Sequence, residues 1–589
     1  MNSLFEKNIN LYAKRYPESA RFIRDLETSS YDVRNSVSGH PVLWVKKSSG
    51  SEIPVDHPEN PVQEATANLP AGDAKDHLMV VMGVGLGYLL FKAVENFPAS
   101  RFMVIEHDPR IFKKALETFD FEKILSNQQI EFFVGFRTEY MPTQFYRFFI
   151  RDDNDEFLAA LELVQNPRVV RLSLQYYQDV SRVLRQSVDN FFDLCVGNSL
   201  QDSLQGMRHA LVNARHMDRM VALDPYAGFF KDTPGIVVSS GPSLNNKLKW
   251  LREVNDKAVI ICADSALRKL LDNGITPFGV SCIERDDENA EYFKSITIPK
   301  NVALFAPIVI KPETFANYPG PACLVHRQCF PHLWLPPLIE TSLLGMSCSH
   351  FSFQVLKILG CNPIALVGQD LAYDRASGQS HYQGVPEFVV AQYAVKEKFL
   401  VEDNQGGQIE TAADWRLFRD MFGDLIRRFS PEMQVLNVIE AGSGARIPGA
   451  KRAEPEDFFS QLKMTGKAIR DFDWQAGRDK VQAKCEWYQS EFDRRLKDAI
   501  HQFRQLRHGF CDLKTAGLFD DYRKIREEKF SGLSQENRYL VEMLLRPDLK
   551  RFDSCARTLW DENEFKTMLP QMVDRWDAVL GDFLEILAA

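Results

Sequence analysis

Residues 236–244 read Ile-Val-Val-Ser-Ser-Gly-Pro-Ser-Leu, an apolar run that ends in small and hydroxyl-bearing residues. The apolar run predicts a buried strand, and Gly241 and Pro242 predict a tight turn into a helix. The hydroxyls beside this turn belong to Ser239, Ser240 and Ser243. Backbone amides at a helix N-terminus hold a phosphate without needing a basic side chain. We therefore expect a phosphate-bearing ligand at this turn.

Two further apolar runs downstream also end in polar residues. Residues 258–263 are followed by Asp264 and Ser265, and residues 279–283 are followed by Glu284 and Arg285. In a parallel sheet these strand ends meet at one edge, where ligands of doubly wound folds bind. A carboxylate there can accept hydrogen bonds from a ribose or sugar hydroxyl. The two acids could instead hold a divalent cation such as Mg²⁺ against a phosphate.

The same alternation of strands and helices extends over a long central block. Its predicted strands are residues 235–239, 258–262, 278–283, 302–307, 322–325, 363–367 and 433–438. A second block, nearer the N-terminus, has a strand over 77–82, a helix over 89–97 and a strand over 101–105. Beyond residue 455 the pattern is helical only. The fold class we predict is α/β, with two Rossmann-like parallel-sheet units followed by an all-helical C-terminal domain.

These blocks predict three domains. The expected boundaries give an N-terminal α/β domain with linking helices over 1–221, a central domain over 222–452 and a helical domain over 453–589. In the first domain, Gly83-x-Gly85-x-Gly87 follows a strand, and Glu106 lies 19 residues after Gly87. This spacing suits a dinucleotide or methyltransferase-like site, but its third glycine comes one residue early for the full fingerprint. A tight structural turn remains the alternative.

Composition narrows the function classes. The 589 residues include 71 Lys and Arg against 80 Asp and Glu, a net charge of −9, so a nonspecific nucleic-acid binder is not expected. The 10 cysteines form no C-x-x-C pair and no zinc-ligand spacing. No apolar stretch approaches the ~20 residues that span a bilayer, so we expect no integral membrane association. Together these features predict a reduced, cytoplasmic protein.

Four segments of the chain resemble one known family. They read SSGPSL (239–244), ADSALRKLLDNGITPFGV (263–280), GCNPIALVGQDLAYD (360–374) and NVIEAGSGARIPGA (437–450). In this order they are similar to the central domain of the motility accessory factor (Maf) family, bacterial flagellin glycosyltransferases. The flanking α/β and helical parts fit the same three-part architecture. The resemblance implies a catalytic central domain and a C-terminal domain that docks the protein acceptor.

The central domain also resembles bacterial sialyltransferases that use CMP-activated nonulosonic acids. Their glycine turn matches 239–244, with Ser240 in place of asparagine, and a Thr-Ser pair ahead of a helix matches Thr341 and Ser342. The nucleotide-sugar-binding residues expected from the strand ends and this resemblance are Ser239, Ser240, Gly241, Pro242, Ser243, Asp264, Ser265, Glu284, Arg285, Thr341, Ser342, Gly368 and Gln369. The resemblance further implies that Tyr373 lies near the leaving phosphate, where a phenol hydroxyl stabilises negative charge.

The catalytic histidine of those sialyltransferases has no counterpart here. The matching stretch lies near Glu410 and Thr411, which contains no histidine. His381 is the nearest alternative, because a loop imidazole can accept a hydroxyl proton near neutral pH. Asp370 is a competing base, as are the strand-end acids Asp264 and Glu284. We predict His381, Asp370 and Tyr373 as the catalytic residues.

The expected reaction follows from the resemblance. A nonulosonic acid of the pseudaminic or legionaminic type would pass from its CMP donor to Ser or Thr hydroxyls of flagellin, in the cytoplasm before export. No cofactor is certain, and a divalent cation remains open. Two alternatives stay beside it. The central domain also resembles archaeal pterin pyrophosphokinases, which would need ATP and magnesium. The missing histidine leaves room for a noncatalytic flagellar assembly factor.

Overall fold

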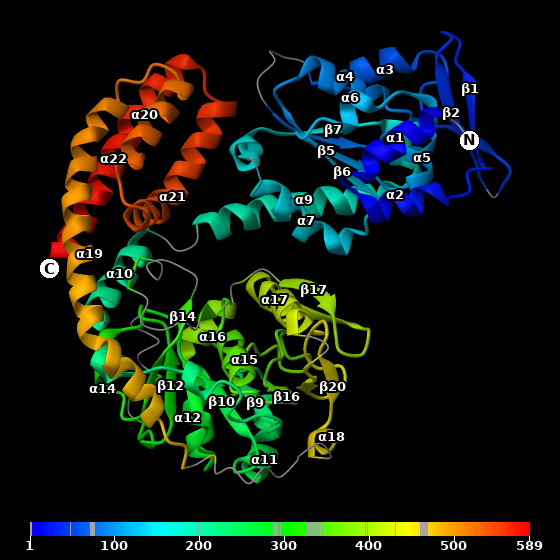
Figure 1. Cartoon of the computed structure of the whole chain (residues 1–589). Helices are drawn as coiled ribbons and strands as arrows, with labels where there is room; N and C mark the ends of the chain where they lie inside the picture. Colours follow the sequence, from blue (N-terminus) through cyan, green and yellow to red (C-terminus); the bar gives the residue numbers. More distant parts are fainter. Residues whose placement is uncertain are drawn as a thin grey trace. The chain divides into compact units, whose positions relative to one another are not determined.

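The structure is a computed structural model, and it divides the chain into two compact units. Its described residues are 3–47, 49–70, 77–151, 153–196, 200–286, 292–294, 296–327, 334–336, 342–343, 345–394, 396, 398–429, 432–459, 469 and 471–588. Unit 1 comprises residues 1–199, 506–531 and 544–579. Unit 2 comprises residues 200–505, 532–543 and 580–589. Figure 1 shows the elements of both units.

Unit 1 is built on a four-stranded parallel sheet of order β6-β5-β4-β7. The strands are β4 (Leu78–Met82), β5 (Arg101–Glu106), β6 (Ile130–Val134) and β7 (Leu161–Gln165). Every residue of β4 is buried, which explains why its sequence is an unbroken apolar run. The helices α1 (Ser3–Ala13), α4 (Tyr88–Asn96) and α5 (Pro109–Thr118) pack on one face, and α9 (Leu174–Val196) packs on the other. The first predicted α/β unit is confirmed.

The C-terminal residues are helical, as predicted. The long helices are α19 (Gln475–Leu513), α20 (Phe519–Ser531), α21 (Gln535–Thr558) and α22 (Glu562–Ala588). Within unit 1, Arg526 of α20 and Asp553 of α21 form a buried ion pair with an N–O distance of 2.7 Å. Parts of these helices belong to each unit. A separate helical domain over 453–589 therefore stays a prediction.

Unit 2 is built on a nine-stranded sheet of order β20-β19-β16-β9-β10-β11-β12-β13-β8, in which all neighbours are parallel. The strands are β8 (Met220–Val221), β9 (Gly235–Val238), β10 (Val259–Ala263), β11 (Gly279–Ser281), β12 (Ala303–Ala306), β13 (Ala322–Leu324), β16 (Ile364–Val367), β19 (Val435–Val438) and β20 (Lys451–Ala453). All seven predicted strands are present. The prediction missed β8 and β20, edge strands too short to show a pattern.

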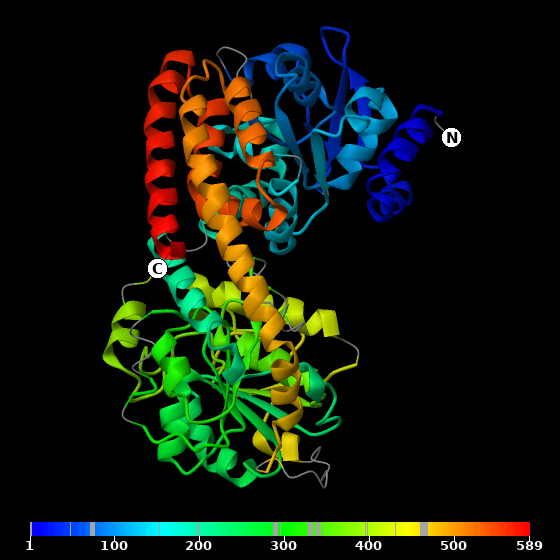
Figure 2. The ribbon, with the colours of Figure 1, turned by 60° about the vertical axis from the view of Figure 1, so that its left-hand side comes forward.

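Helices cover both faces of this sheet (Figure 2). One face packs against α11 (Leu244–Val254) and α12 (Asp264–Asp272). The other packs against α15 (Cys348–Ile358) and α17 (Ala413–Phe429). The strand order reverses between β9 and β16, because β10 lies on one side of β9 and β16 on the other. This reversal is the switch point at which ligands of doubly wound sheets bind.

None of the helices in the described part of the chain is both long enough and apolar enough to cross a membrane.

Candidate functional site

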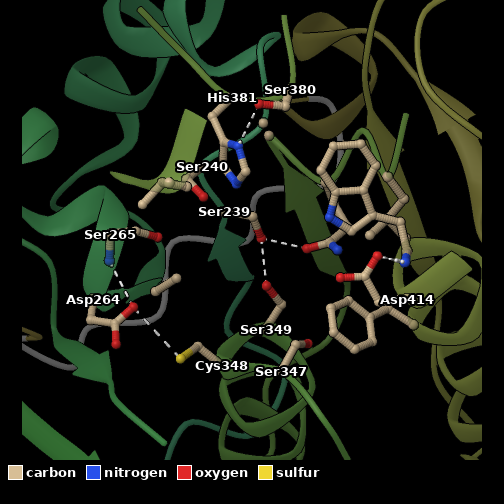
Figure 3. A pocket seen from close by; sticks show the side chains of 18 of the residues that line it. Ser239, Ser240, Asp264, Ser265, Ser347, Cys348, Ser349, Ser380, His381 and Asp414 are labelled. Atoms are coloured by element: carbon tan, nitrogen blue, oxygen red, sulfur yellow. Dashed lines mark hydrogen bonds between the residues drawn. The ribbon is translucent and has the colours of Figure 1, made fainter. Parts of the chain in front are cut away.

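A cavity of about 640 Å³ lies in unit 2 at the switch point of the sheet (Figure 3). Its wall includes the residues that follow β9, β10, β11 and β16, which all end at the same edge. The predicted site residues that line it are Ser239, Ser240, Gly241, Asp264, Ser265, Glu284, Gly368, Gln369 and His381. Residues from five separate segments that were predicted from the sequence therefore line one cavity.

The serine turn after β9 lines the cavity as expected. The Ser239 hydroxyl donates to the side-chain oxygen of Gln369 and lies 2.7 Å from the hydroxyl of Ser349. The Ser240 carbonyl accepts a hydrogen bond of 2.9 Å from the amide of Tyr382. These bonds fix the turn, while the half-buried Ser240 side chain remains at the cavity wall. The turn can therefore offer a hydroxyl to a ligand.

The helix that follows the turn does not offer its N-terminus to a ligand, contrary to the expectation. The Asp370 carboxylate accepts hydrogen bonds from the Ser243 amide (3.1 Å) and the Ser243 hydroxyl (2.8 Å). A Cβ on Gly241 would collide with this carboxylate and with the Gly368 carbonyl. Burial raises the pKa of Asp370 to about 6. A carboxylate of the chain itself therefore caps α11, and neither Asp370 nor Ser243 is among the cavity-lining residues.

Asp264 is the most distinctive group in the wall. It is the first residue of α12, and only 5% of it is exposed. Its Oδ1 accepts from the Ser265 amide at 2.7 Å and lies 3.7 Å from the Cys348 sulfur. Burial, with the nearby Glu284 charge, raises the pKa of Asp264 to about 6. The thiol of the buried Cys282 also hydrogen-bonds to this carboxyl. Because Asp264 lines the cavity, its carboxyl can accept a hydrogen bond from a ligand.

The N-terminus of α15 also reaches the cavity. Ser347, Cys348 and Ser349 line it, and the Ser347 hydroxyl caps the helix by accepting from the His350 amide. Sequence reasoning missed these residues, although a serine directly before a helix is a usual N-cap signal. Thr341 is outside the described residues, and Ser342 belongs to β15 (Ser342–Leu343), with a side chain that is also outside them.

An aromatic wall closes the cavity on the side of α16 (Glu387–Ala394) and α17. Tyr393 and Trp415 stack with ring centroids 4.4 Å apart. Asp414, which sequence reasoning missed, accepts from Lys396 (2.5 Å) and from the Tyr393 hydroxyl (3.0 Å). The bonds and the stacking hold Tyr393, Asp414 and Trp415 against one another.

His381 lies against this aromatic wall. Its ring centroid is 5.1 Å from that of Tyr393, and its Nδ1 is 3.0 Å from the Ser380 hydroxyl. Burial lowers the pKa of His381 to about 4. The imidazole is therefore neutral at physiological pH and has a nitrogen that can accept a proton.

Three other predicted site residues lie outside the cavity wall. Tyr373 donates its hydroxyl to the Tyr393 carbonyl at 2.9 Å, so it supports the wall from behind. Arg285 is buried and pairs with Asp202 at 3.0 Å. Pro242 shapes the serine turn without lining the cavity. For Arg285 the prediction of ligand contact does not match the geometry, because its guanidinium is already engaged by the chain itself.

The charge of the cavity is unusual for an anion site. Among the described residues its wall carries four carboxylates and no Lys or Arg; the acids are Asp264, Glu284, Asp286 and Asp414. Three helices, α12, α15 and α17, begin at the wall, and the positive ends of their dipoles favour an anion there. The described residues contain no group of three or more His, Cys, Asp or Glu placed to hold a metal ion.

The glycine turn of unit 1 is filled by the chain. Gly83, Gly85 and Gly87 all have positive φ, as a tight turn requires. Glu106 accepts from the Val84 amide at 2.8 Å, and Asp56 accepts from the Leu86 amide at 3.2 Å. These carboxylates occupy the amides that would hold a diphosphate in a dinucleotide fold. The geometry favours the structural interpretation of this turn.

The fold and the cavity define a class of protein: a doubly wound α/β fold with a ligand site at its switch point, joined to a second α/β unit and long C-terminal helices. Residues 208–376 match the family model described as 6-hydroxymethylpterin diphosphokinase MptE-like. No curated protein sequence matches the chain.

The particular fold is that of a solved structure, the Maf glycosyltransferase from Magnetospirillum magneticum AMB-1. The likeness covers 100% of this chain and 99% of that chain, with a TM-score of 0.61 and 16% sequence identity. At this identity the likeness establishes the shared fold. The predicted fold class, parallel α/β units with a helical C-terminal region, is confirmed at that level, whereas the division into three domains stays a prediction.

Proposed function

We propose that this protein is a glycosyltransferase of the Maf type that modifies flagellin. The donor is a CMP-activated nonulosonic acid of the pseudaminic or legionaminic type, and the acceptors are Ser or Thr hydroxyls. The observation that carries the proposal is the cavity at the switch point, with the buried carboxyl of Asp264 in its wall. The end-to-end likeness to a glycosyltransferase fold supports it.

The wall suits the parts of such a donor. A ribose hydroxyl donates to the carboxylate of Asp264 in the cavity wall. The phosphate accepts from the Ser240 hydroxyl and from the first amides of α15, where the helix dipole is favourable. A volume of about 640 Å³ lies within the usual range for small-molecule sites. If a divalent cation accompanies the phosphate, Asp264 and Glu284 are the residues that would hold it.

The proposed chemistry is a single displacement. The oxygen of the acceptor hydroxyl forms a bond to the anomeric carbon, and the bond from that carbon to the CMP oxygen breaks. The phosphate leaves with the electron pair, and the hydroxyl proton passes to the neutral His381. Positioning of donor and acceptor against the aromatic wall supplies much of the rate enhancement. The C-terminal helices dock flagellin in this proposal, in the cytoplasm and before export.

The test is transfer to flagellin measured by intact mass. The protein is incubated with unmodified flagellin and with CMP-pseudaminate or CMP-legionaminate, in Mg²⁺ and in EDTA. We expect a mass increase of one sugar per modified site, lost in Asp264→Ala. Asp272→Ala is the matched control, because Asp272 is exposed at the other end of the same helix. No transfer from either donor, together with ATP-dependent diphosphorylation of a hydroxymethylpterin, would replace the proposal with a pyrophosphokinase. CMP binding without turnover would instead support the noncatalytic flagellar assembly factor.

A further inference from the structure

The helix α10 (Leu200–Ala214) is bonded to two loops of unit 2, one that follows β11 and one that follows β12. The Asn213 amide donates to the carbonyls of Ile308 (2.8 Å) and Ile310 (2.9 Å), in the loop that follows β12. The His209 ring nitrogen lies 3.1 Å from the carbonyl of Val309 in the same loop. The second half of this helix is therefore anchored to backbone groups that border the ligand edge.

The first half of the same helix holds Arg285. The Arg285 Nε lies 3.0 Å from Asp202 Oδ1, and the Gln205 side-chain amide donates to the Arg285 carbonyl at 3.3 Å. Gly206 leaves room for the guanidinium, because a Cβ there would collide with Arg285 Nη1. Asp202, Gly206, His209 and Asn213 are spaced three or four apart along α10 and so share one face. Gln205 lies three residues after Asp202 and four before His209, beside the same face.

The neighbours of Arg285 face the other way. Glu284 and Asp286 both line the cavity, whereas Arg285 is 5% exposed and points to α10. The three residues are consecutive in the loop after β11, so the direction of the Arg285 side chain constrains those of its two neighbours. Holding Arg285 against α10 therefore holds both flanking carboxylates toward the cavity. We call Glu284 and Asp286 the acidic rim.

We propose that α10 is a brace that sets the position of the acidic rim through Arg285, and that Arg285 is a positioning residue for ligand binding. The proposal rests on the proposed function in one respect, the use of CMP as the ligand. Arg285 itself touches no ligand in this arrangement. It acts by presenting Glu284 and Asp286, whose carboxylates accept hydrogen bonds from the ribose hydroxyls of the nucleotide, and the Gln205 bond fixes its backbone as well.

The test compares variants of Arg285 with a matched arginine. Arg285→Ala removes the guanidinium, and Asp202→Asn weakens the pair while keeping the side-chain shape. Arg208→Ala is the control, since Arg208 is an exposed arginine of the same helix. Three quantities are measured on the full chain: amide hydrogen exchange over residues 282–286, CMP affinity by calorimetry, and kcat against KM for the CMP-sugar. The thermal midpoint is recorded beside them.

We expect faster exchange over 282–286 in both brace variants, and a loss of CMP affinity of about fivefold or more. The KM for the donor should rise while kcat stays within about twofold, because the brace acts on binding. Arg208→Ala should change none of these. Unchanged exchange in Arg285→Ala overturns the brace, whether or not CMP binds. Faster exchange with unchanged CMP affinity overturns the role of the rim. If the unaltered protein binds no CMP, the proposed donor fails, and exchange alone decides the brace.

Discussion

The Asp370 carboxylate binds both the backbone amide and the hydroxyl of Ser243, at 3.1 and 2.8 Å. The strand end after β16 thereby caps the helix that starts after β9. This pairing ties together the two strands that flank the switch point. It also makes Asp370 a structural acid, in contrast to the catalytic base that we predicted from the sequence.

Asp370→Ala should destabilise the protein more than it alters chemistry. The substitution leaves a buried amide and a buried hydroxyl without an acceptor, which costs about 1–3 kcal/mol. Urea unfolding measures this loss, with the exposed Asp272→Ala as the control. The rate of sugar transfer per folded molecule should fall less in Asp370→Ala than in Asp264→Ala. Unchanged stability with abolished kcat would instead restore Asp370 as the catalytic base.

Asp264→Asn should weaken CMP binding and should stabilise the folded protein. The gain in stability should depend on pH. The pKa of Asp264 is raised to about 6 in the folded protein, from an ordinary value of 3.8. Between these values the folded state holds the proton more tightly than the unfolded state, so stability falls as the pH rises from about 4 to 6. At pH 7.5 the amide should therefore stabilise the protein, by on the order of 1–3 kcal/mol. At pH 4 both forms should be equally stable.

The measurement is the thermal midpoint of both proteins across this pH range, together with CMP affinity at pH 7.5. CMP affinity should drop in Asp264→Asn, because an amide cannot match a carboxylate as a double acceptor of hydroxyls. A stability gain that is the same at pH 4 and pH 7.5 would show that ionisation of Asp264 is not its source.

The pH profile of kcat for transfer should show no inflection near pH 6.5, where an ordinary histidine titrates. Burial lowers the pKa of His381 to about 4, so the ring remains neutral well below pH 6. With saturating donor, kcat should stay level from pH 8 down to about 5 and fall only below that. His381→Gln should lower kcat by about 10²-fold or more. An inflection near 6.5 that persists in His381→Gln would assign the proton transfer to another group.

Glu106→Gln should stabilise unit 1 at alkaline pH. Burial raises the pKa of Glu106 to about 8, from an ordinary value of 4.5. The folded state therefore retains a proton that the unfolded state loses, and its stability declines as the pH rises through this interval. Hydrogen exchange in β4 and β5, compared at pH 6 and pH 9, reports the effect locally. Equal protection from exchange in the unaltered protein and in Glu106→Gln at pH 9 would contradict this prediction.

The sequence was most informative where short, unbroken apolar runs are each followed by polar or small residues and a helix. The strands β9, β10 and β16 are apolar throughout and are followed directly by Ser239, Asp264 and Gly368. These residues meet at one cavity because parallel strands end at one edge of the sheet. The prediction missed Asp414 and Trp415. They reach the cavity from α17, which lies far along the chain, and its position depends on tertiary packing that no local pattern encodes.

The sequence also did not predict the direction in which side chains at the strand ends point. Arg285 and Asp370 each lie at a strand end, and the sequence placed them correctly there. However, Arg285 turns to Asp202 of α10, and Asp370 turns to Ser243. Both partners are at least 80 residues away along the chain. Spacing predicts which strand end a residue occupies, whereas the choice between ligand and internal partner depends on contacts formed only in the folded chain.

The carboxylates of Asp56 and Glu106 at the glycine turn limit the number of nucleotides that one chain can bind. Both parallel sheets contain a switch point, one between β4 and β7 and one between β9 and β16. The first already has its turn amides bonded to these two acids, whereas the second opens onto the cavity. A nucleotide titrated into the full-length chain should therefore saturate at one equivalent per polypeptide, and Asp264→Ala should remove the whole signal rather than half of it.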